Sequence, residues 1–142
     1  FSVRKRVSAT LISLILIIST LFVSASAVDE SMHTVEPRYT GLSTFTTTLI
    51  LGTGTAQCHS SSTLSNGSYT QTLTMRLQRS VNQSVWTTLQ SWTSNGGFVA
   101  TTEGTRSITH GYYYRLYCTA NVYTSSGSWY GSNTKISDSQ YY

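Results

Sequence analysis

The sequence predicts an all-β domain, an antiparallel sandwich of about seven strands. Short segments in which apolar and polar residues alternate recur at spacings near a dozen residues, with turn-forming residues between them. These segments are rich in the β-branched and aromatic residues that strands favour. The chain lacks the period of an amphipathic helix and has a single proline, which argues against a helix bundle and against disorder.

The first 27 residues are predicted to be a secretory signal peptide. A basic cluster at residues 4–6 precedes an apolar run over 11–23, and small residues at 25–27 form an acceptable cleavage site. We expect cleavage after Ala27, which makes the protein secreted and extracellular. The alternative is an uncleaved anchor, but the run is short for a span of about 20 residues. Residues 28–40 lack periodicity and are expected to form a flexible N-terminal tail.

The predicted mature chain is nearly neutral. Three of the nine Lys and Arg residues lie in the signal peptide, so six remain against five Asp and Glu residues. The formal charge of +4 therefore describes the export signal. Because no Lys/Arg cluster remains, we exclude nucleic acid as a partner. We also expect no stable membrane span after signal cleavage.

The predicted sandwich domain covers residues 41–137, and three strands fill its first half. The first strand follows Gly41 and ends near Leu51, and the second covers 55–64. Asn66-Gly67 predicts a tight type I′ hairpin turn between the second and third strands. The third strand, over 72–78, places Leu and Met on one face and polar residues on the other.

The second half of the domain contains the most regular strand of the chain. The fourth strand, Val85–Trp92, has an ambiguous period, and the fifth, Phe98–Ile108, is expected to be interrupted near Glu103-Gly104. Over Tyr112–Tyr123, apolar residues alternate with a mixed polar and aromatic set, which predicts a central strand with one face on the core. Trp129–Ile136 is the last predicted strand. Residues 138–142 are expected to form a C-terminal tail.

Cys58 and Cys118 are predicted to form a disulfide between the two sheets. Each cysteine lies on the apolar face of its strand, and their separation of sixty residues is similar to that in an immunoglobulin domain. The alternative is a pair of buried thiols that only pack. An immunoglobulin domain would have a tyrosine two residues before the second cysteine, where this chain has Leu116. Tyr114 is expected to take that role with a different geometry, so the pattern is immunoglobulin-like in architecture only.

The sequence predicts no catalytic site, no metal site and no cofactor. The three histidines, at positions 33, 59 and 110, lack ligand spacing with another His, Cys or acidic residue. Glu103 and Asp138 are the two carboxylates of the predicted domain, and a serine-nucleophile motif is missing. We therefore predict that the protein is not an enzyme.

Aromatic residues supply the best candidate contact surface. The alternation over 112–123 places three tyrosines on the outward face of the central strand, and further aromatic residues follow in the last strand. Exposed rings on a flat sheet can stack on sugars or anchor a protein partner, although cross-strand packing is the simpler interpretation. The candidate ligand-contact residues are Tyr113, Tyr117, Tyr123, Trp129 and Tyr130.

Several segments together resemble a group of uncharacterised small exported β-sandwich proteins of Gram-positive, clostridia-like bacteria. The segments are residues 37–40 (Pro-Arg-Tyr-Thr), 77–79 (Leu-Gln-Arg), 86–92 (Trp-Thr-Thr-Leu-Gln-Ser-Trp), and 114–116 running into 121–123. The last two strands also look fibronectin-type-III-like. The resemblance implies an extracellular address and an immunoglobulin/fibronectin-III-like fold, but no activity.

These observations lead to two main hypotheses about function. The first is a secreted non-enzymatic binding or cell-surface interaction module, with an unknown extracellular protein or glycan as its partner. The alternative is a secreted bacteriocin-like effector acting on neighbouring cells, whose edge strand Trp129–Ile136 pairs with a target or a second copy. A third and weaker hypothesis is a small hydrolase that uses Glu103 or Asp138.

Overall fold

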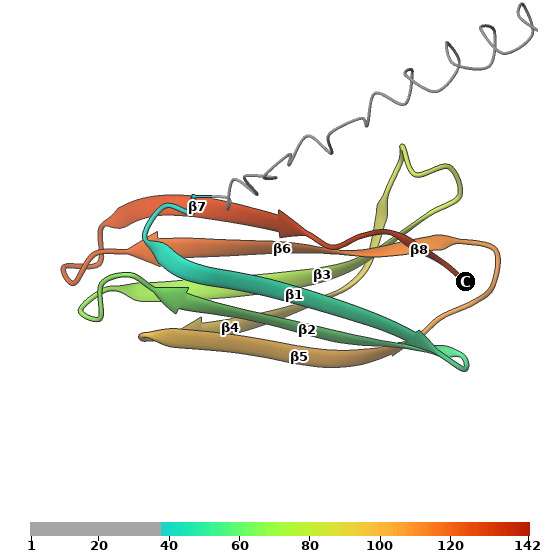
Figure 1. Cartoon of the computed structure of the whole chain (residues 1–142), viewed down its shortest axis with the longest axis horizontal. Coiled ribbons are helices and arrows are strands. Elements are labelled where there is room, and N and C mark those ends of the chain that lie inside the picture. Colours follow the sequence, from blue (N-terminus) through green and yellow to red (C-terminus); the bar gives the residue numbers. More distant parts are fainter. Residues whose placement is uncertain (1–37) are drawn as a thin grey trace, which may run out of the picture. The chain divides into compact units, whose positions relative to one another are not determined.

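A computed structural model describes residues 38–142, which form an antiparallel β-sandwich (Figure 1). The predicted signal peptide, its cleavage site at Ala27 and the predicted tail up to Pro37 lie outside the described residues. Within the described part of the chain, no helix is long and apolar enough to cross a membrane.

The described chain contains eight strands, one more than the sequence predicts. They are β1 (Leu42–Gly52), β2 (Thr55–Leu64), β3 (Thr70–Ser80), β4 (Thr87–Gly96), β5 (Val99–Ser107), β6 (Tyr113–Tyr123), β7 (Trp129–Ile136) and β8 (Gln140–Tyr141).

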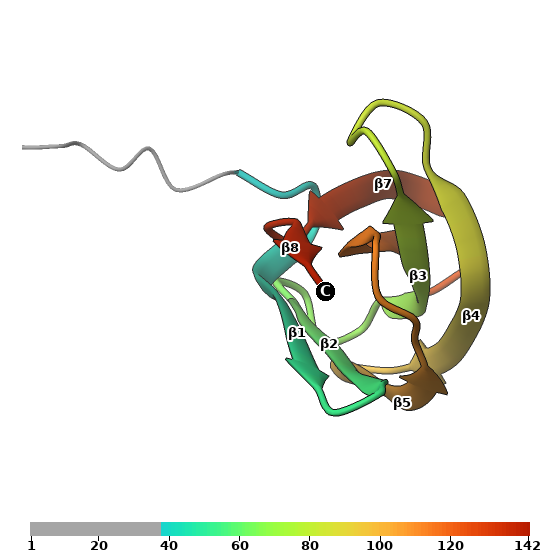
Figure 2. The ribbon, with the colours of Figure 1, turned by 90° about the vertical axis from the view of Figure 1, so that its right-hand side faces the viewer.

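The strands form two sheets that face each other, as Figure 2 shows from one end. The three-stranded sheet has the order β1-β2-β5. The five-stranded sheet has the order β4-β3-β6-β7, and β8 pairs with the start of β6. In a constant-type immunoglobulin domain the fourth strand joins the sheet of strands one, two and five. Here β4 pairs with β3, so the strand order differs from that of a constant-type immunoglobulin domain.

β6 is the central strand of the larger sheet, as the alternation predicts. It pairs with β3 along its whole length, with β7 over its second half and with β8 at its start. Its residues alternate strictly between half-buried and buried, and the buried ones are Tyr114, Leu116, Cys118, Ala120 and Val122.

The core fills the space between the sheets and is mainly apolar, with a smaller set of buried polar side chains that includes Gln71, Ser62 and Asn133. Every strand from β1 to β3, together with β5 and β6, contributes buried inward side chains. The buried apolar residues are Leu42, Phe45, Leu49, Ala56, Cys58, Leu64, Leu73, Met75, Leu77, Ala100, Ile108, Tyr114, Leu116, Cys118, Ala120 and Val122.

Tyr114 forms the corner that the sequence predicts, with its own geometry. The Tyr114 hydroxyl donates to the Thr109 carbonyl at 2.8 Å and accepts from the Thr109 amide at 3.1 Å. The side chain is fully buried, and these two bonds satisfy its one polar atom. The ring therefore fixes the loop before β6 to the core.

The predicted Asn66-Gly67 hairpin is wrong. β2 and β3 belong to different sheets, and neither Asn66 nor Gly67 has a positive φ. Instead the Asn66 side chain accepts hydrogen bonds from the Ser68 amide at 3.0 Å and the Ser68 hydroxyl at 2.8 Å. This Asx-type turn carries the chain from one sheet to the other, because Asn can close a turn through its own side chain.

β5 is continuous, whereas the sequence predicts a break near Glu103-Gly104. Gly104 occupies an inward position of β5, and a Cβ there would overlap the Trp92 indole of β4. The glycine therefore makes room for a close-packed ring rather than ending the strand. The fourth strand also begins at Thr87 rather than at Val85, whose side chain is exposed.

The segment predicted as a C-terminal tail is held against the domain. Residues 140–141 form β8, and the Tyr142 ring stacks on His110 with centroids 4.1 Å apart. The Tyr142 hydroxyl accepts from the Gly54 amide at 2.6 Å, and the Gln140 side-chain amide donates to the Leu49 carbonyl at 2.8 Å. The segment thereby closes one end of the sandwich over both sheets.

Candidate functional site

The outward residues of β6 form a continuous row of polar and aromatic side chains. We call this row the β6 stripe, and it consists of Tyr113, Arg115, Tyr117, Thr119, Asn121 and Tyr123. All six side chains are half-buried among their neighbours and open to solvent at the sheet surface. Because a strand rises about 3.3 Å per residue, the stripe is about 33 Å long.

Arg115 lies in the first half of the stripe and is held from three sides. Its guanidinium carbon lies 4.0 Å from the Trp86 ring centroid and 5.9 Å from that of Tyr117. Its Nε donates to Gln78 Oε1 at 2.9 Å. Partial burial lowers the pKa of Arg115, which still leaves a guanidinium charged at neutral pH. Cation–π stacking and the Gln78 bond together orient a positive charge on the face of the sheet.

The β3–β4 loop places Trp86 over this arginine. The Ser80 hydroxyl accepts from the amides of residues 82 and 83, and the Asn82 side chain accepts from the amides of residues 84 and 85. The Trp86 indole then donates to the Gln83 carbonyl at 3.2 Å. These local bonds give the loop a defined shape, so that Trp86 is held in position before β4 begins.

The structure divides the five predicted contact residues into separate groups. Tyr113 and Tyr117 lie in the Arg115 half of the stripe, and the Tyr113 ring packs on the exposed Tyr141 ring at 4.9 Å. Tyr123 lies at the far end, opposite Trp129 of β7. Three of the predicted residues thus share the stripe, and Trp129 lies beside its far end.

Tyr130, the fifth predicted residue, is separated from the stripe by a β-bulge. The register between β6 and β7 shifts there, so Tyr123 pairs with Trp129 and Val122 with Gly131. The Tyr130 ring instead packs against Tyr69 at 5.2 Å. The Tyr130 side chain is half-exposed, and its ring contacts the segment that connects β2 and β3.

Uncharged hydrogen-bonding side chains flank the second half of the stripe on both sides. A rank of four threonines crosses β4, β3, β6 and β7, formed by Thr93, Thr74, Thr119 and Thr134. The next rank contains Asn95, Thr72, Asn121 and Ser132. Neighbouring strands lie about 4.8 Å apart, so each rank offers hydroxyl and amide groups at short, regular intervals.

The described part of the chain carries more positive than negative charge. Residues 38–142 contain six Lys and Arg residues but two acidic residues, Glu103 and Asp138. Their single ion pair joins His59 Nε2 to Glu103 Oε1 at 3.6 Å. Within residues 38–142, no arginine or lysine is therefore paired with a carboxylate.

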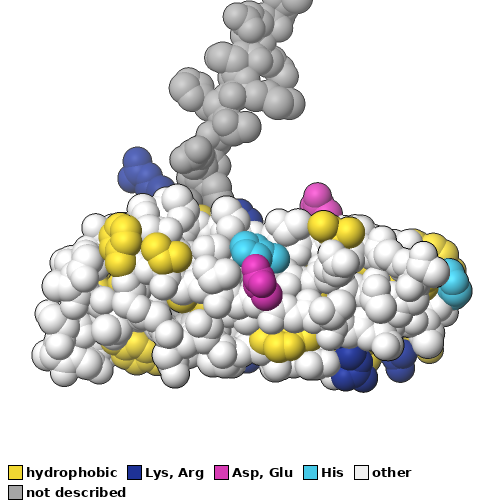
Figure 3. Space-filling view, turned by 90° about the horizontal axis from the view of Figure 1, so that it is seen from below, with side chains coloured by type: hydrophobic (Ala, Val, Ile, Leu, Met, Phe, Trp, Pro, Cys, Tyr) yellow, Lys and Arg dark blue, Asp and Glu magenta, His cyan; other side chains and the backbone are white. Residues whose placement is uncertain are grey.

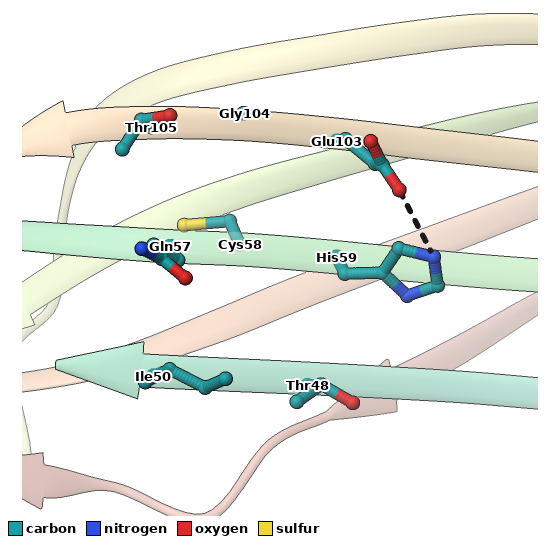
Figure 4. A pocket seen from close by; sticks show the side chains of 8 residues that line it. All are labelled: Thr48, Ile50, Gln57, Cys58, His59, Glu103, Gly104 and Thr105. Carbon is teal, nitrogen blue, oxygen red and sulfur yellow. Dashed lines mark ion pairs between the residues drawn. The ribbon is translucent and has the colours of Figure 1, made fainter.

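A hollow lies on the outer face of the three-stranded sheet. It has a volume of about 300 Å³, and the side chains of Figure 4 line it from β1, β2 and β5. In Figure 3 a histidine and an acidic side chain lie together near the middle of a mostly uncharged face. His59 and Glu103 are 42% and 73% exposed, and such surface pairs contribute little to stability.

The geometry of this hollow matches none of the chemical arrangements considered for the sequence. Glu103 comes from the three-stranded sheet, whereas Asp138 follows β7 of the other sheet. Within the described residues, no group of three His, Cys, Asp or Glu side chains could hold a metal ion. The hollow therefore offers one open ion pair and several amide and hydroxyl groups.

The predicted disulfide is wrong, because Cys58 and Cys118 are both free and buried. The prediction placed both side chains correctly on inward faces of opposite sheets. However, a disulfide also needs a narrow range of distance and orientation between the two cysteines, which spacing along the chain cannot reveal.

Both thiols are expected to be unreactive in the folded protein. Burial, followed by the effect of Cys118, raises the pKa of Cys58 to about 12, and burial also raises the pKa of Cys118. Since the thiolate is the nucleophile, iodoacetamide at pH 8 should add nothing to the native protein. In denaturant without reductant we expect two adducts by intact mass. Absence of adducts there, with two appearing after reduction, would contradict the free thiols.

The edge strand proposed for the effector hypothesis is partly covered. β7 does lie at an edge of the larger sheet. The Asn133 side chain nevertheless accepts from the Thr40 amide at 2.6 Å and donates to the Thr40 carbonyl at 2.8 Å. Thr40 also packs so closely on Gly131 that a Cβ there would lie 2.6 Å from its methyl group. Thr40 therefore packs against the middle of β7 at Gly131 and Asn133.

The sequence interpretation missed the residues that surround Tyr117. It placed Arg115 on the outward face without giving it a role, and it assigned no function to Arg76 or Gln78. Strand pairing brings Gln78 opposite Arg115 and Arg76 opposite Tyr117. The alternation in β3 and β6 was visible in the sequence, but their register and the fold of the β3–β4 loop were not.

Comparison with known proteins places no further constraint on this chain. It matched no protein family, no curated protein and no solved structure.

Proposed function

We propose that this domain is a non-enzymatic binding module that acts outside the cell and binds an extended glycan along the β6 stripe. The observation that carries the proposal is the Trp86–Arg115–Tyr117 arrangement on an open sheet face, with the guanidinium 4.0 Å from the Trp86 centroid. The Arg115 side chain contacts the Trp86 and Tyr117 rings on the sheet surface, and none of the three side chains is part of the buried core.

The shape of the surface supports an extended ligand. The stripe follows a single strand, so its side chains lie in line at intervals of about 6.6 Å over about 33 Å. Aromatic rings at positions 113, 117 and 123 can stack on sugar rings, and the threonine and asparagine ranks can bond to hydroxyls. A small molecule would instead favour a concave pocket.

The composition of the surface also favours a glycan over a protein partner. Protein interfaces usually have an apolar, desolvated centre surrounded by a polar rim. Here the middle of the stripe is Tyr117 and Thr119, flanked by Arg76 and the threonine rank. Ile136 of β7, which lies opposite Tyr117, adds an exposed aliphatic side chain beside the middle of the stripe. Such a surface is suited to repeated hydrogen bonds and ring stacking.

Replacement of Tyr117 by alanine is expected to weaken glycan binding roughly tenfold, or about 1.4 kcal/mol, because it removes the central ring of the stripe. Binding of the purified protein to a glycan array, followed by titration of the best ligand, measures this effect. Tyr113→Ala should weaken binding in the same direction, since Tyr113 lies in the same row.

Phe98→Ala is the matched control for these variants. Phe98 is also an exposed aromatic residue, 53% accessible, but it lies in the β4–β5 turn. Its truncation should leave affinity within a factor of about two, as expected for a surface change away from the site. Equal losses for Phe98→Ala and Tyr117→Ala, or no binding to any glycan, would reject the proposed site.

A further inference from the structure

We infer that the β6 stripe recognises a polysaccharide that carries carboxylates, with neutral sugars between them, and that Arg115 is the residue that binds the carboxylate. This inference rests on the proposed glycan-binding function and names the chemical class of its ligand. It follows from the orientation of one guanidinium, the presence of a second on the neighbouring strand, and the absence of an ion pair to either arginine within residues 38–142.

Arg115 is arranged as a receptor for a planar anion. One of its nitrogens, Nε, is used by Gln78, and one face of the guanidinium lies against Trp86. The terminal nitrogens, with their fork of N–H donors, have no acceptor among the described residues. A guanidinium fork matches the two oxygens of a carboxylate, and orienting it in advance lowers the entropy lost on binding.

Arg76 places a second positive charge next to the first. It lies opposite Tyr117 while Gln78 lies opposite Arg115, so the two arginines are diagonal neighbours on adjacent strands. The backbones of diagonal neighbours in a sheet are about 7–8 Å apart. Within the described chain, the Arg76 side chain donates one long hydrogen bond, to Thr119 Oγ1 at 3.5 Å. The face of the sheet therefore carries a second guanidinium without a carboxylate partner among the described residues, which adds to its positive potential.

The surroundings of these arginines distinguish among anionic polymers. Beyond Thr119 the stripe and its neighbours on β3 and β7 are uncharged, with hydroxyl and amide groups and the rings of Tyr123 and Trp129, which suit neutral sugars. A nucleic acid would need a longer row of cations to neutralise successive phosphates. An acidic protein would need a desolvated pocket at the centre of its interface, whereas this row lies open to solvent along a strand.

The test compares polygalacturonate with its methyl ester, because the two polymers have the same sugars and differ in charge. The purified protein is expected to bind polygalacturonate at least tenfold more tightly than the ester in affinity gel electrophoresis. Arg115→Gln should lose at least tenfold in affinity for polygalacturonate and little for the ester. Arg115→Lys, which keeps the charge but loses the planar fork, should recover only part of that loss.

Arg106→Gln is the control for net charge. Arg106 lies in β5 of the other sheet, where it donates to the Leu89 carbonyl and to Gln90 Oε1. The affinity of Arg106→Gln for polygalacturonate should stay within about twofold of that of the original protein. If Arg106→Gln and Arg115→Gln lost the same affinity, the loss would come from overall charge, and the role of Arg115 would be overturned.

The remaining outcomes separate the two proposals. Equal binding of the ester and the acid would overturn the carboxylate inference while the glycan-binding function stands. If the protein bound neither these polymers nor any neutral glycan of the array, both the carboxylate inference and the glycan-binding function would be overturned. Tighter binding to single-stranded DNA or to polyglutamate than to polygalacturonate would show that the partner is a different class of anionic polymer and would overturn the inference.

Discussion

Replacement of Leu116 by alanine is expected to lower the free energy of unfolding by about 2–5 kcal/mol, the usual range for truncating a buried leucine. Leu116 is completely buried in the middle of β6, opposite Leu77 of β3. Truncation removes apolar contacts and leaves a cavity that the paired strands on either side cannot collapse to fill. Since small domains are stable by only about 5–15 kcal/mol, the variant should be near the limit of folding at 37 °C.

Urea unfolding followed by tryptophan fluorescence measures this loss, because Trp92 packs against Gly104 between the sheets. Ile50→Ala is the matched control, since it truncates an aliphatic side chain of the same size that is 54% exposed. The control should lose less than about 1 kcal/mol. If the two variants lost the same amount, Leu116 would not belong to a packed core.

Replacement of Gln71 by alanine is expected to cost about 3 kcal/mol, combining a small cavity with the loss of buried hydrogen bonds. Gln71 is 2% exposed in β3, and its Oε1 accepts from the Ser62 hydroxyl at 2.5 Å. Its Nε2 lies 3.1–3.3 Å from the carbonyls of residues 62, 97 and 98. One amide thus links β2, β3 and the β4–β5 turn, and its removal leaves buried polar groups unpaired.

Two further variants separate these hydrogen bonds from packing. Gln71→Met keeps most of the volume, so it should lose nearly as much stability as Gln71→Ala if hydrogen bonding dominates. Gln57→Ala, at an exposed position of β2, should change stability by less than about 0.5 kcal/mol in the same urea titration. A fully stable Gln71→Met variant would show that the amide contributes through its size alone.

The strands could be predicted because periodicity is a local property of the sequence. The alternation from Tyr112 to Val122 predicts an inward face of six residues, and the structure buries five of them but leaves Tyr112 half-buried just before β6. The predicted bounds of the last strand, Trp129–Ile136, are also those of β7. A two-residue strand such as β8 has no period, so only its tertiary contacts with β6 and β1 define it.

Pairing between strands could not be predicted, because it depends on distances that the sequence does not encode locally. Asn66-Gly67 identified a turn, but turn chemistry does not tell whether the chain stays in one sheet or crosses to the other. Cys58 and Cys118 were assigned to inward faces and are both buried, yet whether two such cysteines meet with the geometry of a disulfide depends on how the sheets are aligned. The same limit hid the contact between Trp86 and Arg115, which come from a loop and a strand far apart in sequence.

The late position of β6 in the chain has a consequence for how the protein folds during synthesis. β6 pairs with three strands and provides five of the buried core residues, yet it begins only at residue 113. A nascent chain that ends before β6 can form the β1–β2 and β3–β4 hairpins, but it cannot bury the inward faces of β3 and β5. Cooperative folding must therefore wait until nearly the whole domain has left the ribosome, since long-range pairing is slow to form.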